Sequence, residues 1–213
     1  NNHLGFCNVI FGWDMVDQAY TNNSYTGWHS GYPDAKVQID LSSCRKIPWE
    51  NNMPFFLGQF IDDAGNPLEI CPRQLLKKII GHATKQGFTA NFSQEFEWFN
   101  FLETPHSFAE KAGRNLTPIS PGMFGYSILR SSERKDFCSS LFDSLKAFNI
   151  PLEGLHTETG PGVYEAAIKY SDTLSAADNA LLFKSAVKEI AYQHGILATF
   201  MAKINENLPG CSG

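Results

Sequence analysis

The segment Glu95–Phe101 constrains the fold of this chain more than any other part of its sequence. It reads Glu-Phe-Glu-Trp-Phe-Asn-Phe, and successive side chains of a β-strand point to opposite faces. One face would carry two aromatic residues, Phe96 and Trp98. The other face would carry two glutamates and two phenylalanines, Glu95, Glu97, Phe99 and Phe101. Large aromatic side chains on both faces are typical of a strand that is covered on both sides.

Two glutamates on one face of such a strand have two interpretations. If the face is inward, an unpaired buried carboxylate is costly, so Glu95 and Glu97 either have basic partners or hold cations. Their Cβ atoms would lie about 7 Å apart in a strand, near enough to serve neighbouring metal ions. If the face is solvated, the aromatic side chains pack sideways instead. The segment alone leaves both interpretations open.

A second acidic cluster surrounds the turn Gly160-Pro161-Gly162, which connects two strand-like segments. Glu158 and Glu165 flank the turn, and Glu153 and His156 precede it. Carboxylate oxygens suit hard cations such as Mg²⁺ and Mn²⁺, and a lone imidazole is compatible with Mn²⁺. A hydrogen-bonded core histidine is the alternative explanation of His156 taken alone. Spacing therefore indicates only a candidate carboxylate-rich metal site.

Periodicity along the whole chain predicts an α+β fold with a domain boundary near residue 70. The predicted strands cover residues 37–41, 55–61, 68–70, 88–101, 151–158 and 163–170. The second and third of these would form a hairpin around the turn-rich residues 62–67. The predicted helices cover residues 72–87, 132–148 and 175–194. The last helix is expected to open with a capping box of Ser175 and Asp178 and to close on Gly195.

Composition and charge argue against several classes of protein. No run of the sequence approaches the roughly eighteen apolar residues of a membrane span. A formal net charge of -5 gives no general electrostatic reason to bind nucleic acid. The 5 cysteines are odd in number and lack ligand-like spacing, and residues 1–10 lack the basic start and apolar stretch of a secretory signal. Free thiols in the cytoplasm are therefore expected.

Several motifs of this chain resemble those of glutamine synthetase. In the second half they are Glu95–Phe99, Glu158–Glu165, Ala176–Lys184 and Ala198–Lys203, and in the first half Pro33-Asp34, Ile39–Ser42, Pro48–Glu50 and Cys71–Arg73. Spaced motifs in a consistent order are more specific than any one alone, so the chain is identified as a member of that family. The resemblance implies a β-grasp-like N-terminal domain over residues 1–70. It implies part of the catalytic domain, an antiparallel sheet or half-barrel with helices, over residues 71–213.

The resemblance also implies a reaction. Glutamine synthetases use ATP to phosphorylate the γ-carboxylate of glutamate, and ammonia then displaces the phosphate from γ-glutamyl phosphate. The expected cofactor is Mg²⁺ or Mn²⁺, which neutralises phosphate charge, and ATP is a substrate. The expected partners are glutamate, ATP, and ammonia or an organic amine. Further copies of the chain are expected in a ring-shaped homo-oligomer of ten or twelve subunits.

The family's metal ligands correspond to four glutamates of this sequence, Glu95, Glu97, Glu158 and Glu165. The last three of these correspond to ligands of the metal nearest glutamate. The first, Glu95, corresponds to a ligand of the metal nearest the ATP phosphates.

Other site residues also correspond by motif. Glu153 takes the place of a nucleotide contact, and Tyr170 takes the place of an aromatic residue near the adenine. In the family, an aspartate from a neighbouring subunit takes a proton from ammonium. Asp14 is the best match for this aspartate, and Asp17 is its rival.

Departures from the family pattern leave the amine substrate open. The usual second histidine before Glu158 is Thr157, and the usual glutamine after the turn is Val163. Residues 116–130 resemble a divergent branch that includes γ-glutamyl ligases for polyamines or alkylamines and lengsin, a non-catalytic structural relative. The four metal-binding glutamates argue against loss of catalysis. The family's next motif, His-x-His, would follow Gly213, so these 213 residues alone are expected to be inactive.

Overall fold

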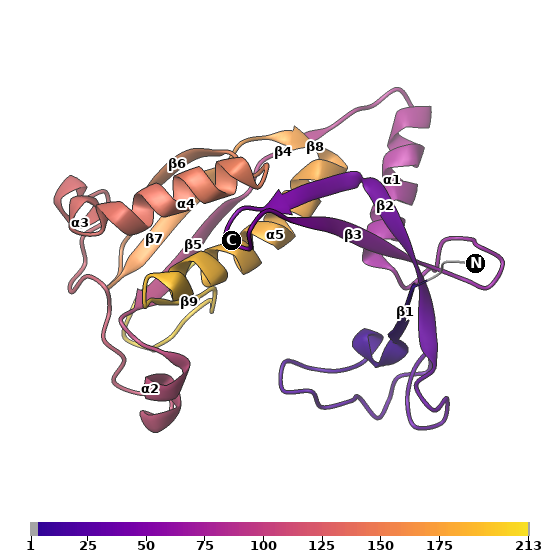
Figure 1. Cartoon of the computed structure of the whole chain (residues 1–213), viewed down its shortest axis with the longest axis horizontal. Helices are drawn as coiled ribbons and strands as arrows, with labels where there is room; N and C mark the ends of the chain where they lie inside the picture. The colour runs from indigo at the N-terminus through magenta and orange to yellow at the C-terminus, as the bar shows by residue number, and fades with distance from the viewer. Residues whose placement is uncertain (1–3, 213) are drawn as a thin grey trace. The chain divides into compact units, whose positions relative to one another are not determined.

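The computed structural model describes residues 4–212 and shows an α+β chain with two compact units (Figure 1). Unit 1 spans Asn1–Arg45 and Pro54–Thr89, and unit 2 spans Lys46–Met53 and Ala90–Gly213. Within the described part of the chain, no helix combines the length and the apolar character that crossing a membrane requires.

Unit 1 is built around a three-stranded sheet with the order β1-β2-β3. Its elements are β1 (Leu4–Cys7), the 3₁₀ helix η1 (Asn8–Phe11), β2 (Asp34–Ile47), β3 (Met53–Ile61) and α1 (Pro72–Lys85). The helix is joined to the sheet by an ion pair, because Arg73 of α1 donates to Asp40 of β2 at 2.7 Å. Gly87, with φ of 85°, follows the end of α1 in the left-handed conformation that the sequence predicts there.

The predicted turn after β3 is present, since the N–H of Asp62 donates to the carbonyl of Asn66 at 2.8 Å, but the predicted strand over residues 68–70 is wrong. These residues form no strand, and the sheet partner of β3 is β2. Pro67 makes only an isolated bridge to Ile61. The N–H of Leu68 still donates to the carbonyl of Phe60 at 3.0 Å, but the chain then turns into α1.

Helix α1 is grouped with unit 1, so the division of the chain by packing falls after Thr89. The sequence-based boundary lies near residue 70, at the start of this helix. The two positions differ because Arg73, at the first turn of α1, packs on the sheet that precedes it. The functional boundary near residue 70 stays a prediction.

Unit 2 is built around a four-stranded antiparallel sheet with the order β6-β7-β5-β9. Its elements are β4 (Asn91–Phe92), β5 (Glu95–Phe101), α2 (Pro105–Glu110), α3 (Ile128–Glu133), α4 (Lys135–Ala147), β6 (Leu152–Thr157), β7 (Val163–Ile168), β8 (Ser171–Asp172), α5 (Thr173–Gln193) and β9 (Leu197–Thr199). Strands β4 and β8 pair separately. The strand predicted over residues 88–101 is confirmed as a continuous strand only over Glu95–Phe101, which lies between β7 and β9.

Helices α4 and α5 cover one face of this sheet (Figure 1). Trp98 of β5 is fully buried, and its ring lies 5.8 Å from that of Phe183 on α5. Phe137 of α4 also packs against Tyr164 of β7, with ring centroids 6.0 Å apart. The indole N–H of Trp98 donates to the side chain of buried Asn100 at 2.8 Å. The face of β5 that carries Phe96 and Trp98 is therefore packed against the helices, and the glutamates lie on the opposite face.

The starts of two helices differ from the sequence prediction. The capping box of Ser175 and Asp178 is wrong, because α5 begins earlier and the carboxylate of Asp172 accepts the N–H groups of Leu174 and Ser175. The predicted helix over residues 132–148 is interrupted at Arg134, where φ of -122° and ψ of 34° separate α3 from α4.

Candidate active site

The sheet register brings two glutamates and a histidine from three adjacent strands into one row. Glu97 of β5 is paired directly with Glu165 of β7, and Glu165 is paired with His156 of β6. The backbone N–H of Glu97 donates to the Ser212 carbonyl rather than to β7. Glu97 and Glu165 are therefore a non-hydrogen-bonded pair, the kind whose side chains lie closer together. The row lies on the face opposite Trp98.

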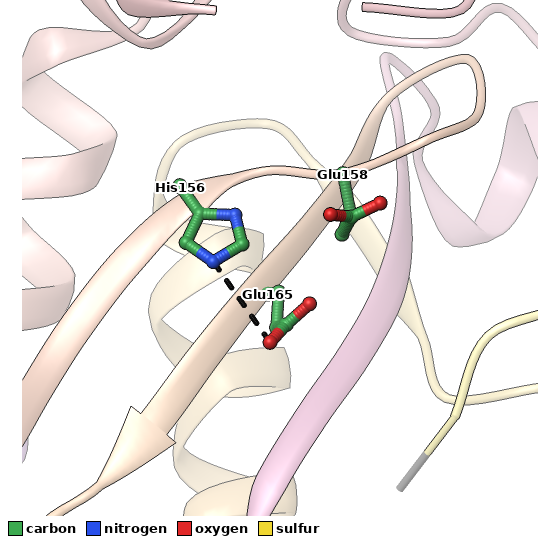
Figure 2. A group of neighbouring side chains, drawn as sticks. All are labelled: His156, Glu158 and Glu165. Carbon is green, nitrogen blue, oxygen red and sulfur yellow. Dashed lines mark ion pairs between the residues drawn. The ribbon is translucent and has the colours of Figure 1, made fainter. Parts of the chain in front are cut away.

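Glu158 joins this row from the segment that follows β6. The ligand atoms of His156, Glu158 and Glu165 all lie within 4.8 Å of one another (Figure 2). The imidazole Nε2 of His156 lies 3.8 Å from a carboxylate oxygen of Glu165. All three side chains are half-buried, so the group is partly screened from solvent.

The turn between β6 and β7 places the two flanking glutamates on the same side. The N–H of Glu158 donates to the carbonyl of Val163 at 2.9 Å, which closes the turn. Gly162 has φ of 72°, and a Cβ at this position would lie 2.5 Å from the carbonyl oxygen of Asn100. Glycine is therefore required here both for its backbone conformation and for the close approach to β5.

Negative charge accumulates in this group. Burial, together with the carboxylates of Glu97 and its neighbours, raises the pKa of Glu165, although the His156 imidazole opposes the shift. The pKa of Glu158 is lowered instead, chiefly because the backbone N–H of Thr159 donates to its carboxylate. A divalent cation at this position would neutralise the crowded carboxylates.

The donor set fits a divalent cation. Two carboxylates and one imidazole converge, and the Glu97 carboxylate lies beside them in the sheet. Oxygen donors suit Mg²⁺ and Mn²⁺, and a single imidazole is compatible with Mn²⁺. Within residues 4–212, His156, Glu158 and Glu165 are the only group of three or more His, Cys, Asp or Glu residues whose ligand atoms all lie within 4.8 Å of one another.

The other predicted site residues of unit 2 lie farther along the same strands. Glu95 is exposed at the start of β5, opposite Ala167. Exposed Glu153 lies at a β-bulge of β6, a feature that can re-aim a side chain. Exposed Tyr170 follows β7, at the same end of the β6–β7 pair as Glu153 and away from Glu158.

The aspartates proposed for the ammonium site belong to unit 1. Asp14 fixes a local turn, because its Oδ1 accepts the N–H groups of Val16 and Gln18 at 2.9 and 3.0 Å. Asp17 is exposed and has φ of 61°. The role of either residue toward a neighbouring subunit stays a prediction.

Two residues that contact the cluster were not among the sequence candidates. The ring of Tyr126 stacks on His156 with centroids 4.5 Å apart, and its hydrogen bond to Glu158 raises the pKa of Tyr126. The hydroxyl of Ser212 donates to Glu97 at 2.7 Å. Both contacts join distant segments, so no local pattern in the sequence indicates them.

Comparison with known proteins identifies the family. A model of the glutamine synthetase catalytic domain matches residues 69–213. Type-1 glutamine synthetase 2 of Dictyostelium discoideum is 55% identical over 210 residues, which cover 99% of this chain and 40% of that protein. Glutamate–isopropylamine ligase of a Pseudomonas species is 37% identical over 206 residues, covering 97% of this chain and 45% of that protein. The chain therefore spans less than half the length of these relatives.

Solved structures show the same fold. The complex of GmaS with ADP matches 99% of this chain and 45% of its own, with a TM-score of 0.77 and 22% identity. Plasmodium falciparum glutamine synthetase matches 98% of this chain and 43% of its own, with a TM-score of 0.71 and 18% identity. Together with the family model, which covers most of the sequence, these matches show that the chain belongs to the glutamine synthetase family.

Proposed function

We propose that the whole protein is an ATP-dependent ligase that forms an amide on the γ-carboxylate of glutamate, with ammonia as the simplest amine. The observation that carries this proposal is the convergence of His156, Glu158 and Glu165, with Glu97 paired directly with Glu165 in the same sheet. The relative named type-1 glutamine synthetase 2, which is 55% identical, supports it.

In this proposal the carboxylates divide their work between two divalent cations. Glu97, Glu158 and Glu165 would hold the cation nearest glutamate, and Glu95 would hold the cation nearest the ATP phosphates. Such cations supply neutralisation of phosphate charge during formation of γ-glutamyl phosphate. Glu153 would contact the nucleotide, and its place on a β-bulge suits a side chain that is turned toward a ligand.

A ligase for an organic amine is the second candidate. One relative is named a glutamate–isopropylamine ligase, and another, 27% identical, is named a γ-glutamylethanolamide synthetase. Thr157 replaces the family's usual histidine, and its hydroxyl accepts the N–H of Ser127, beside the Tyr126 that stacks on His156. This departure therefore changes the support of the segment that carries Tyr126.

Phosphate release from ATP tests these proposals. The whole protein would be supplied with Mg²⁺ and glutamate, and with ammonium or one of a panel of alkylamines and polyamines. Release that depends on ammonium supports glutamine formation, and release only with a larger amine supports the second candidate. Silence across the panel from a folded protein would contradict both and favour a structural relative.

We also propose that the protein assembles as a ring-shaped homo-oligomer, in which Asp14 of one subunit serves the site of its neighbour. Native mass spectrometry of the whole protein would test the assembly. A monomer at working concentrations would contradict it.

A further inference from the structure

Both carboxylate oxygens of Glu97 are held by one residue, Ser212. The Ser212 hydroxyl donates to Glu97 Oε1 at 2.7 Å, and the Ser212 backbone N–H donates to Oε2 at 3.1 Å. The backbone N–H of Glu97 donates in return to the Ser212 carbonyl at 3.0 Å. Three hydrogen bonds thus join two residues that lie 115 positions apart in the sequence.

Ser212 is itself held in place by its neighbour. Half-buried Cys211 packs against the apolar cluster of Phe99, Phe101 and Val163, on the same face of the sheet as Glu97. The N–H of Cys211 also donates to the carbonyl of Ala202 at 2.8 Å. The position of Ser212 therefore does not depend on its bonds to Glu97 alone.

We propose that Ser212 is a positioning residue for cation binding, which orients the Glu97 carboxylate toward the cation that it shares with Glu158 and Glu165. This inference rests on the proposed function, in which Glu97 is a cation ligand. An ionised carboxylate offers about four lone-pair sites. Two of them accept bonds from Ser212, which fixes the rotation of the group and leaves the others for a cation.

The hydroxyl is the part of this arrangement that a substitution can remove. Ser212→Ala leaves the backbone N–H bond to Oε2 but removes the bond to Oε1. Groups that orient metal ligands typically change metal affinity by about 10- to 100-fold when they are removed. Because one of the two bonds survives, a loss near the lower end, about tenfold, is expected. Ser212→Thr keeps the hydroxyl and is expected to bind close to wild type.

The test is titration of the whole protein with Mn²⁺, without ATP or glutamate, with free Mn²⁺ measured by electron paramagnetic resonance. Wild type is compared with Ser212→Ala, Ser212→Thr and Ser185→Ala, a control at an exposed serine of α5. Weaker binding by Ser212→Ala alone, with an unchanged melting temperature, supports the inference. Equal affinity of Ser212→Ala and wild type would overturn it, as would failure of Ser212→Thr to restore binding.

A double-mutant cycle with Glu97→Gln distinguishes positioning of Glu97 from a general structural role of Ser212, because only positioning makes the effect of Ser212→Ala on Mn²⁺ affinity depend on Glu97. If Ser212 acts through Glu97, Ser212→Ala should weaken Mn²⁺ binding no further in the Glu97→Gln background. An undiminished effect in that background contradicts the inference. Absence of Mn²⁺ binding by the folded wild type would contradict the proposed metal site as well, whereas wild-type binding that Ser212→Ala leaves unchanged contradicts the positioning role alone.

Discussion

At the scale of single residues, Glu165 destabilises the fold when it is ionised and is also a proposed cation ligand. Burial and neighbouring carboxylates raise its pKa, so its ionised form is less favourable in the folded protein than in the unfolded chain. Above its ordinary pKa, this ionisation therefore weakens the fold. Glu165→Gln should raise the melting temperature at neutral pH in the presence of a chelator, and it should weaken Mn²⁺ binding.

Calorimetry with EDTA and a Mn²⁺ titration check this prediction. Glu110→Gln, at an exposed glutamate of α2, is the matched control and should change neither quantity. A lower melting temperature for Glu165→Gln, or Mn²⁺ affinity equal to wild type, would contradict the account of the cluster.

In unit 1, the pKa of Asp40 is shifted downward, in the direction opposite to that of Glu165. The Ser42 hydroxyl, followed by the Arg73 guanidinium, lowers the pKa of Asp40 from 3.8 to about 2. Its stabilising effect is complete above the unfolded value and is lost as the pH falls from about 4 to about 2. The shift corresponds to about 2 kcal/mol, because one pKa unit is about 1.4 kcal/mol.

Asp40→Asn should therefore cost about 2 kcal/mol near pH 7 and flatten the dependence of stability on pH below pH 4. Urea unfolding followed by circular dichroism at several pH values measures both effects. Asp63→Asn is the control, because Asp63 pairs with Lys36 on the surface, where an ion pair contributes about 1 kcal/mol or less. Equal losses for the two variants would contradict the argument.

At the scale of elements, the turn between β6 and β7 depends on Gly162. Alanine there would have a positive φ and a Cβ 2.5 Å from the Asn100 carbonyl oxygen, so the turn would be displaced from β5. Gly162→Ala should destabilise the protein by about 2 to 4 kcal/mol and weaken Mn²⁺ binding, because Glu158 and Glu165 flank the turn.

Gly154 in β6 provides the matched control. No atom lies within 4 Å of a Cβ built at this position. Gly154→Ala should therefore have a much smaller effect on denaturant unfolding and on Mn²⁺ titration. If the two alanine variants unfolded at the same denaturant concentration, the role assigned to the turn would be wrong.

The sequence predicts the type of most elements but not their long-range partners. Helical stripes and alternation reveal α1, α5 and β5 because these patterns are local. The N-cap of α5 is Asp172 rather than Ser175, since capping depends on backbone geometry that periodicity does not specify. The strand expected over residues 68–70 is absent, because the chain makes only an isolated bridge to β3 at Pro67 and then turns into α1.

The same limit applies to the site. Glu97 and Glu165 can be identified by motif, but their direct pairing requires the register of β5 against β7. The contacts of Tyr126 with His156 and of Ser212 with Glu97 arise only when the chain folds. Motif resemblance therefore indicates which residues matter, and the structure adds which residues hold them.

At the scale of the whole molecule, the proposed roles are divided between the two units. The acidic cluster belongs to unit 2, and Asp14 belongs to unit 1. Asp14→Asn should therefore lower turnover with ammonium while leaving Mn²⁺ binding unchanged. Asp17→Asn is the comparison in the same assays, and a loss of turnover confined to that variant would transfer the role to Asp17.

The most direct test of the central claim is glutamate-dependent phosphate release by the whole protein with ATP and Mg²⁺, measured for wild type, Glu158→Gln and the control Glu110→Gln. Wild type and the control should release phosphate when an accepted amine is present. The rate of phosphate release by Glu158→Gln should be at least about 100-fold lower than that of wild type. Even groups that only orient metal ligands change metal affinity or activity by about 10- to 100-fold when they are removed. Full activity of Glu158→Gln, or no release by the folded wild type with any amine, would contradict the account.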